Sequence, residues 1–389
     1  MTITVIIAFC LLLLIAYLFD FTSSKTKIPP VILLLLLGWV VRQLTGLFGL
    51  SLPDFSPVLP VLGTIGLILI VLEGSLELEL NASKSGLIAK SFLGALAPMF
   101  ALAFILAYAF HMLGYGSLKD GLINAIPLCV ISSAIAIPSV RNLSAPNREF
   151  VIYESSLSDI FGVLLFNFLA LNDTIDKFSV GNFALELLII TVVSFIATIG
   201  LSLLLSKIEH HIKFVPIILL VVLIYAVSKL YHLPGLIFIL IFGLFIGNLE
   251  ELKRFQWINK LKPDELSKEV TKFKELTIEG AFLVRSLFFL LFGFLIETAE
   301  VLNTDTLFWA VGIVLLITLL RAVQLKVSRL PLQPLLFVAP RGLITILLFL
   351  SIEPAHTLEI VNKSLIVQVI LLSAVLMMVG LMTNKTRNI

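Results

Sequence analysis

"VIYESSLSDIFGVLLFNFLAL", residues 151–171, is an apolar stretch that carries two acids, Glu154 and Asp159, near its beginning. A helix of about 20 apolar residues is long enough to cross the hydrocarbon core of a bilayer. An acid inside such a helix costs at least ~2.5–3.5 kcal/mol, so it requires a partner or a function. The stretch therefore predicts a membrane-spanning helix that holds a functional acid.

The whole chain has the composition of a membrane protein. Of its 389 residues, 59% are hydrophobic and 13% are charged, whereas soluble domains have about 45–50% and about 25%. The formal net charge of only +2 gives no strong positive electrostatic field, so it does not indicate nucleic-acid binding. Cys10 and Cys129 lie in apolar runs without a neighbouring His or second Cys, so they indicate neither a disulfide framework nor a metal site.

Thirteen apolar segments predict an all-α polytopic membrane protein of about 13 transmembrane helices. The longest break between them, 250–275, mixes Lys and Glu with aromatic residues and predicts an interfacial helical loop. The first segment has no basic leader and no cleavage site, so we expect a retained helix. The predicted spans are 2–19, 28–44, 56–76, 88–112, 120–140, 151–171, 182–206, 213–230, 232–249, 277–299, 304–328, 333–352 and 362–383.

The basic residues give the orientation of these spans. Nineteen of the 27 Lys and Arg residues fall in loops on one side, five fall on the other side and three lie within spans. Basic residues accumulate on the cytoplasmic side of a membrane. We therefore predict a protein of the plasma (cell inner) membrane with its N-terminus outside and its C-terminus in the cytoplasm.

Two segments indicate an internal repeat. Residues 27–44 align without gaps on residues 232–249, which matches Pro29 with Pro234 and Gly38 with Gly243. The two copies are the second and the ninth predicted spans, seven positions apart in the order of spans, so they cross the bilayer in opposite directions. Inverted-topology repeats are typical of transporters with a binding site near the bilayer midplane. Chance similarity between two Leu/Ile-rich helices is the alternative.

The two acids of 151–171 face different directions. Residues five apart point about 140° away from each other on a helix. Arg321 lies seven residues before the end of its span, at a depth of about 10 Å that is similar to that of the acids. We predict a Glu154–Arg321 ion pair, which leaves Asp159 as the unpaired carboxylate. The alternative is that Glu154 and Arg321 reach the membrane interface separately.

Two spans are predicted to be discontinuous, because Pro removes a backbone hydrogen bond in mid-span. Freed backbone groups are tolerated in a membrane only where they face protein or a watery cavity. Arg341 is expected to neutralise the C-terminal end of a half-helix. An ordinary Pro kink is the alternative for each span. The residues at the breaks are Ser132 and Ser133 in "PLCVISSAIAIPSV" (127–140), and Pro340, Arg341 and Gly342 in "PLLFVAPRGLITILL" (334–348).

Several motifs resemble those of the monovalent cation/proton antiporter superfamily of the Na+/H+ exchanger type. They are "ESSLSDIFG", "PRGLI", "RAVQLKVS", "LEGSLELEL" and "LPGLIFILIFGLFIGN", in the family's order over nearly the whole chain. The resemblance implies that Asp159 binds the cation and the proton, with Ser155 as a helper ligand. Ser132 and Ser133 are further candidate ligands.

The resemblance also implies a division into a scaffold that forms a homodimer and a core that moves against it. The scaffold would be 1–87 and 207–303, including the cytoplasmic loop 250–275, the core would be 88–181 and 304–389, and helix 182–206 would link them.

Two departures from the family leave the cation open. Sodium exchangers usually have Thr-Asp-Pro in the first broken helix, whereas "ISSAIAIPS" has no acid and is similar to potassium-efflux relatives. Ser158 stands where other members have Asn, Gln or a second Asp. We expect antiport of a monovalent cation (Na+, K+ or Li+) for H+, with Na+ slightly favoured and K+/H+ exchange as the alternative.

A mechanism follows from one free carboxylate. A buried acid holds a proton or a dehydrated cation but not both, which couples the two fluxes in an elevator-type exchange. One carboxylate predicts one cation per proton, so exchange is electroneutral.

Two other functions on this fold are less consistent with the sequence. An organic-anion symporter would need more polar residues in the broken helices. A sensor that does not transport ions would be expected to have lost Asp159 or Arg321. The sequence has no Ser/His/Asp order typical of a catalytic triad, no spacing of metal ligands and no phosphate-binding loop. We therefore expect neither an enzyme nor a cofactor.

Overall fold

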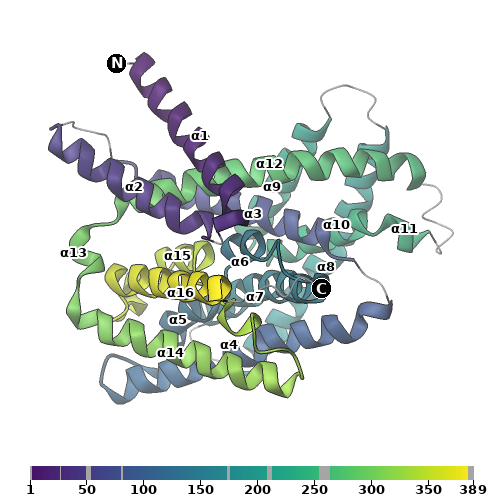
Figure 1. Ribbon diagram of the computed structural model, residues 1–389. Helices are drawn as coiled ribbons and strands as arrows, with labels where there is room; N and C mark the ends of the chain where they lie inside the picture. Colours follow the sequence, from purple (N-terminus) through teal and green to yellow (C-terminus); the bar gives the residue numbers. More distant parts are fainter. Residues whose placement is uncertain are drawn as a thin grey trace.

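The computed structural model describes residues 2–26, 28–49, 54–79, 82–172, 176–207, 213–253 and 263–383, and within these ranges it contains helices and no strands (Figure 1). Ten helical segments in the described ranges are long and apolar enough to cross a membrane. Two shorter apolar helices, α9 (Phe214–Leu230) and α10 (Gly235–Gly247), accompany them. The prediction of an all-α polytopic membrane protein is confirmed, while the count of thirteen spans stays a prediction.

Eleven of the predicted spans correspond to one helix each, and the other two correspond to interrupted helices. The single helices are α1 (Thr2–Thr26), α2 (Pro30–Leu47), α3 (Val58–Glu77), α4 (Ser85–Met112), α7 (Ala145–Leu171), α8 (Lys177–Lys207), α9, α10, α12 (Pro263–Leu295), α14 (Thr304–Val327) and α16 (Lys363–Thr383). The interrupted ones are α5 (Leu118–Cys129) with α6 (Ser133–Ser139), and η3 (Leu335–Phe337) with α15 (Leu343–Leu350). Short elements connect them: η1 (Ala82–Lys84), α11 (Leu249–Leu252), α13 (Thr298–Val301) and η4 (Pro354–His356).

Helices α7 and α12 begin earlier than hydropathy indicates. Helix α7 begins at Ala145, where a Pro in the first turn suits a helix start because its missing N–H needs no partner. Helix α12 begins at Pro263, so the second half of the predicted loop 250–275 is the first part of this helix. Residues 254–262 of that loop lie outside the described residues. Charged side chains of 263–275 hide this part of the helix from a hydropathy window.

The helices pack in two groups. Helices α2, α3, α10 and α12 pack against one another, and α1 contacts α2 and α12. Helices α4, α5, α6 and α7 pack together, with α14 on both α4 and α16. In Figure 1 the first group lies mostly in the upper part of the molecule and the second in the lower part. We call them the α3/α12 group and the α7/α14 group; their roles as scaffold and moving core stay a prediction.

Both glycines that the repeat aligns lie at close helix crossings. A Cβ added to Gly38 of α2 would lie 2.7 Å from the backbone nitrogen of Phe294 in α12. A Cβ on Gly243 of α10 would lie 2.7 Å from the Cβ of Ser75 in α3. Any side chain at either position would force the helices apart, because these distances are shorter than van der Waals contact.

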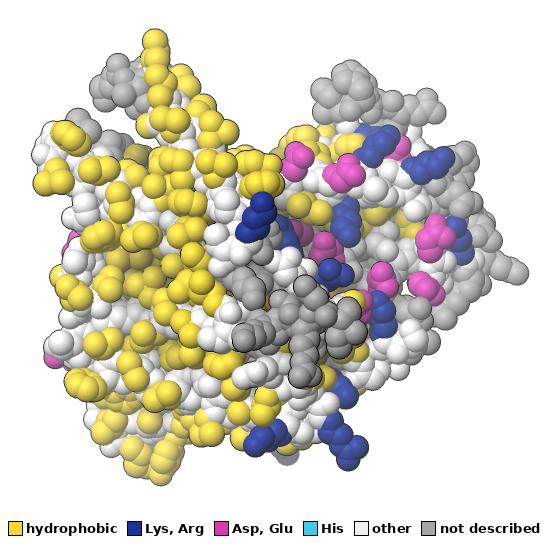
Figure 2. Space-filling model, in the orientation of Figure 1, with side chains coloured by type: hydrophobic (Ala, Val, Ile, Leu, Met, Phe, Trp, Pro, Cys, Tyr) yellow, Lys and Arg dark blue, Asp and Glu magenta, His cyan; other side chains and the backbone are white. Residues whose placement is uncertain are grey.

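The surface is apolar over most of the face in Figure 2, while Lys, Arg, Asp and Glu gather on the side where α11 and the beginning of α12 lie. We call this side the charged edge. Helix α1 projects from the molecule, and only 6% of its span Ile6–Ser23 is buried. An exposed helix of this hydropathy is stable in lipid or against another apolar surface.

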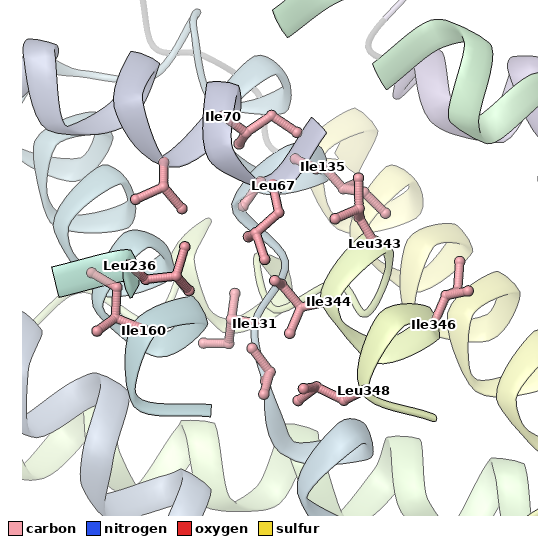
Figure 3. Packing of buried hydrophobic residues seen from close by; sticks show 14 of the residues in the cluster. Leu67, Ile70, Ile131, Ile135, Ile160, Leu236, Leu343, Ile344, Ile346 and Leu348 are labelled. Carbon is pink, nitrogen blue, oxygen red and sulfur yellow. The ribbon is translucent and has the colours of Figure 1, made fainter. Parts of the chain in front are cut away.

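An apolar cluster fills the contact between the two groups (Figure 3). The α3/α12 group contributes side chains from α3 and α10. The other side chains come from α7, from α6, from the α5–α6 break and from α15, which packs on both α5 and α3. The labelled members are Leu67, Ile70, Ile131, Ile135, Ile160, Leu236, Leu343, Ile344, Ile346 and Leu348. The two groups therefore meet through a surface that has few directional bonds.

Candidate functional site

The two interrupted helices cross at their breaks. Helix α5 ends at Cys129 and α6 begins at Ser133, with the backbone of Val130 and Ser132 extended between them. The second break lies between η3 and α15, and its Pro340 carbonyl accepts a hydrogen bond from the backbone nitrogen of Ser132 at 2.9 Å. The prediction of two discontinuous helices is confirmed. Each break supplies a backbone partner for the other, as a buried polar group requires.

Arg341 lies buried at this crossing. Its Nε donates to the Leu128 carbonyl at 2.7 Å, and its Nη1 donates to the Ala339 carbonyl at 2.8 Å. Its backbone nitrogen donates to Ser373 Oγ at 3.0 Å. The last carbonyls of a helix have no partner within the helix and carry partial negative charge. The guanidinium thus satisfies and neutralises the C-terminal end of the half-helix α5.

Asp159 points from α7 to the first break. Its side chain is buried, with the residue 1% exposed, and Oδ2 accepts a hydrogen bond from Ser133 Oγ at the start of α6. Its other oxygen, Oδ1, has no hydrogen-bond partner among the described residues. A buried carboxylate oxygen without a partner is costly, so it needs a bound proton or cation.

Two further buried hydroxyl groups lie on the elements that carry Asp159 and Ser133. Ser132 Oγ, from the residue before Ser133, and Ser156 Oγ, on α7 one turn before Asp159, are buried and without partners within the described ranges. Oxygen atoms of this kind are suitable ligands for hard cations. Ser155 Oγ instead donates to the Val151 carbonyl of its own helix at 2.7 Å. No described contact joins Ser155 to Asp159, and Ser156 carries no sequence signal that distinguishes it.

Ser158 holds the first break against α7. Its buried Oγ accepts a hydrogen bond from the backbone nitrogen of Ile131 at 2.9 Å. One turn further, Gly162 leaves space for Val130, whose Cβ would lie 3.4 Å from a Cβ added there. Ser158 therefore satisfies a backbone donor that the interruption of the helix leaves free. The sequence shows only that Ser158 departs from the residue types of the family, because the partner of its hydroxyl group is known only from the fold.

Glu154 and Arg321 form a bidentate ion pair on another face of α7. Nη1 lies 2.9 Å from Oε1 and Nη2 lies 2.8 Å from Oε2, with both residues buried. Arg321 Nε also donates to the Leu335 carbonyl at 2.6 Å. Gly94 of α4 makes room for the carboxylate, because a Cβ there would lie 2.7 Å from Oε1. The structure thus brings these two residues together and leaves Asp159 outside the pair.

A cavity of about 490 Å³ opens at the charged edge between α3 and α12 on one side and α6 and α7 on the other. We call it the vestibule. Glu73 lines it and lies 3.8 Å from Arg285, with both residues buried. Next to Glu73, a Cβ on Gly74 would lie 2.9 Å from Ser156 Oγ. On α7 the lining of the vestibule ends at Tyr153, six residues before Asp159.

Ion pairs close part of the vestibule wall. Lys84 Nζ lies 2.6 Å from Glu79 at the end of α3 and 3.0 Å from Glu149 of α7. The hydrogen bond with Glu79 raises the pKa of Lys84 above its usual value, so this lysine stays charged. Tyr153 of α7 donates to the Glu79 carbonyl at 2.5 Å. These bonds join the two groups of helices at the wall of the vestibule.

Comparisons with known proteins agree with this architecture. The family model "Sodium/hydrogen exchanger, transmembrane" matches residues 10–384. A structure of the sodium proton antiporter MjNhaP1 from Methanocaldococcus jannaschii at pH 8 has a TM-score of 0.64 and 18% identity, covering 98% of this chain and 96% of that chain. A three-dimensional electron microscopy map of the same antiporter gives a TM-score of 0.67 and 18% identity, covering 98% and 95%. A sequence search of curated proteins finds no match.

The likeness to solved structures shows the fold, because the identity is low. The family match covers nearly the whole chain and confirms the resemblance that the motifs indicate. The proteins that match are antiporters rather than enzymes. The chain is therefore an integral membrane protein with the fold of cation/proton antiporters, and it belongs to the sodium/hydrogen exchanger family.

Proposed function

We propose that this protein exchanges a monovalent cation for H+ across the membrane and that both ions compete for Asp159. The observation that carries the proposal is the unpaired Oδ1 of a buried carboxylate at the crossing of two broken helices. A bare charge there is costly, so the site favours a state in which a proton or a cation neutralises it. Because one carboxylate cannot hold both, release of one ion precedes binding of the other.

The mechanism we propose is elevator-type alternating access. Asp159 and both breaks belong to the α7/α14 group, and the facing group presents apolar side chains such as Leu67 and Leu236. A neutralised site can pass this apolar surface at low cost, whereas a bare carboxylate cannot. Movement of the loaded α7/α14 group would expose the site to opposite sides in turn. The vestibule is the entrance in the present conformation.

The proposed orientation places the vestibule on the cytoplasmic side. It lies at the charged edge, where Lys84, Arg141 and Lys274 line it. Basic residues accumulate on the cytoplasmic side, which puts the N-terminus outside and the C-terminus inside the plasma membrane. We also propose a homodimer, because the apolar face of α1 has little cover within the described chain.

Selectivity between Na+ and K+ is the open part of the function. Ser132 and Ser133 supply hydroxyl groups at the break where sodium exchangers usually carry an acid. Na+ is slightly favoured by the family to which the chain belongs, and K+ is favoured by the missing acid. A non-transporting sensor on this fold would not need a buried, unpaired carboxylate at the crossing of the two breaks.

The test is dequenching of a pH-sensitive dye in everted vesicles from a host without its own exchangers. After a respiration-driven proton gradient forms, Na+ is expected to dequench the dye, with K+ and Li+ added separately for comparison and choline as the control. Cation-driven proton release supports the proposal, because only exchange links the two ions. Dequenching by K+ alone would select K+/H+ exchange. No response to any of the three cations contradicts the proposed function.

We expect the exchange to be electroneutral, because Asp159 is the only carboxylate with an unpaired oxygen near the crossing in the described ranges. A net charge moved in each cycle would change the driving force by about 2.3 kcal/mol per 100 mV. In proteoliposomes under a clamped potential, the rate of Na+-driven proton movement should be the same at zero and at negative potential. A rate that follows the potential refutes the one-to-one stoichiometry but leaves the site assignment intact.

A further inference from the structure

A second cavity, of about 320 Å³, lies on the other side of Arg141 from the vestibule. Helices α1 and α2 form one wall, and the end of α6 with the end of α16 forms the other. The α1 and α2 wall contributes apolar side chains such as Tyr17 and Ile28, and Leu381 faces them from α16. The cavity therefore lies between the two groups of helices and has an apolar body.

One end of this cavity is charged. Arg141 Nη1 lies 3.1 Å from Asp20 Oδ2, and the side chain of Arg141 is 46% exposed. A guanidinium group has five N–H donors in a planar fork. The single described ion pair with Asp20 leaves donors that can bind an anion in two-point geometry. The cavity is thus an apolar slot that has a phosphate-binding group at its end.

The position of the cavity fits the boundary between acyl chains and headgroups. Helix α1 ends at Thr26, α2 begins at Pro30 and α6 ends at Ser139, so three helix ends meet at this level of the membrane. Tyr17 and Phe21 extend the apolar wall along the exposed face of α1 towards the membrane interior. A molecule bound here would have its polar end at the charged edge and its apolar end beside α1.

We propose that this cavity binds an anionic phospholipid. Its phosphate pairs with Arg141, and one acyl chain lies along Tyr17 and Phe21. The phosphate accepts hydrogen bonds from the guanidinium donors that Asp20 leaves free, because arginine binds phosphate and carboxylate oxygens in the same geometry. A zwitterionic lipid fits the apolar body equally well but carries an ammonium group that competes for the phosphate.

This site goes beyond ion exchange because it spans both groups of helices. Arg141 lines the vestibule as well as the lipid cavity, so its partner on one side affects the wall of the other. A lipid held between α1 and α6 is bound only in conformations in which these two helices are at the present distance. By linkage, such a lipid favours those conformations over others.

The test is native mass spectrometry of the full-length protein, with dioleoyl phosphatidylglycerol and dioleoyl phosphatidylcholine added in equal amounts. We expect phosphatidylglycerol to be retained about tenfold more strongly, the size expected for one charge-assisted contact. Arg141→Gln should remove this preference. Asp20→Asn should increase it, because the competing carboxylate is gone. The matched control is Arg148→Gln, which lies at the same edge and lines the vestibule but not this cavity.

Ser139→Trp, which fills the cavity from α6, should abolish the retention of both lipids. The thermal stabilisation of each variant by phosphatidylglycerol is measured against its own lipid-free value, so a general loss of stability does not affect the comparison. Equal retention of both lipids by the unaltered protein, or an unchanged preference in Arg141→Gln, overturns the proposal. Competition by free glycerol phosphate would also overturn it, because the site would then recognise phosphate without a lipid.

Discussion

Asp159→Asn is expected to lose cation-driven proton exchange down to the background of the assay while it remains folded. The amide keeps the shape of the side chain, and its oxygen still accepts the hydrogen bond from Ser133. It cannot bind and release a proton, and it offers no negative charge to a dehydrated cation. Dye dequenching in everted vesicles and ²²Na+ uptake into proteoliposomes are the two measurements.

The folded state should not suffer from this substitution. An unpaired buried carboxylate destabilises a protein, so a neutral amide in its place should leave the thermal unfolding temperature unchanged or higher. The control is Asp305→Asn, which removes an exposed carboxylate at the start of α14 and should retain full exchange. Exchange in Asp159→Asn above about a tenth of the unaltered rate would show that another group carries the ions.

The second large effect is expected from the pair of Glu154 and Arg321. Removing one partner of a buried pair leaves the other charge uncompensated, at a cost of about 3–5 kcal/mol in the free energy of unfolding. Arg321→Gln and Glu154→Gln should each cause a loss of this order. The double variant should lose much less than the sum, because no unpaired charge remains. Unfolding in detergent, analysed as a double-mutant cycle, measures the coupling.

An exposed ion pair of the same residue types in this chain provides the control for the loss in free energy of unfolding. Arg42 and Glu297 lie 3.0 Å apart but are partly exposed to the surroundings. Separating such an exposed pair is expected to cost no more than about 1 kcal/mol. Additive losses at Glu154 and Arg321, or losses as small as those at the exposed pair, would contradict the structural role of the buried pair.

Much of the fold follows from the cost of placing polar groups in lipid. The apolar runs predict the helices because each must be long enough to cross a bilayer. The mid-span prolines predict interruptions because each removes a backbone hydrogen bond. Pro340 lies at its break, whereas Pro138 lies within α6 and the first break precedes it, between Cys129 and Ser133. The similar depths of Glu154 and Arg321 in the membrane predict an ion pair, and the structure places the two side chains in contact. These inferences need only distances along single helices.

The details of the site need distances between helices, which the sequence does not contain. Which serine donates to Asp159 depends on how the two breaks cross: Ser133 donates to it, whereas Ser155 donates to its own helix. The bond from Arg341 to Leu128 joins residues 213 positions apart. The start of α12 was missed for a different reason, since its charged first turns lie beyond the apolar part that hydropathy detects.

The apolar cluster between the two groups has a consequence for how this sequence can vary over evolution. Contacts of side chains such as Leu67, Ile160 and Ile344 are non-directional, and each atom pair contributes only about 0.1–0.2 kcal/mol. Exchanges among Leu, Ile and Val of similar volume are therefore tolerated across that surface. The hydroxyl and carboxyl oxygens near Asp159 have no such freedom. Related chains should therefore vary widely where the two groups meet and stay fixed around the carboxylate.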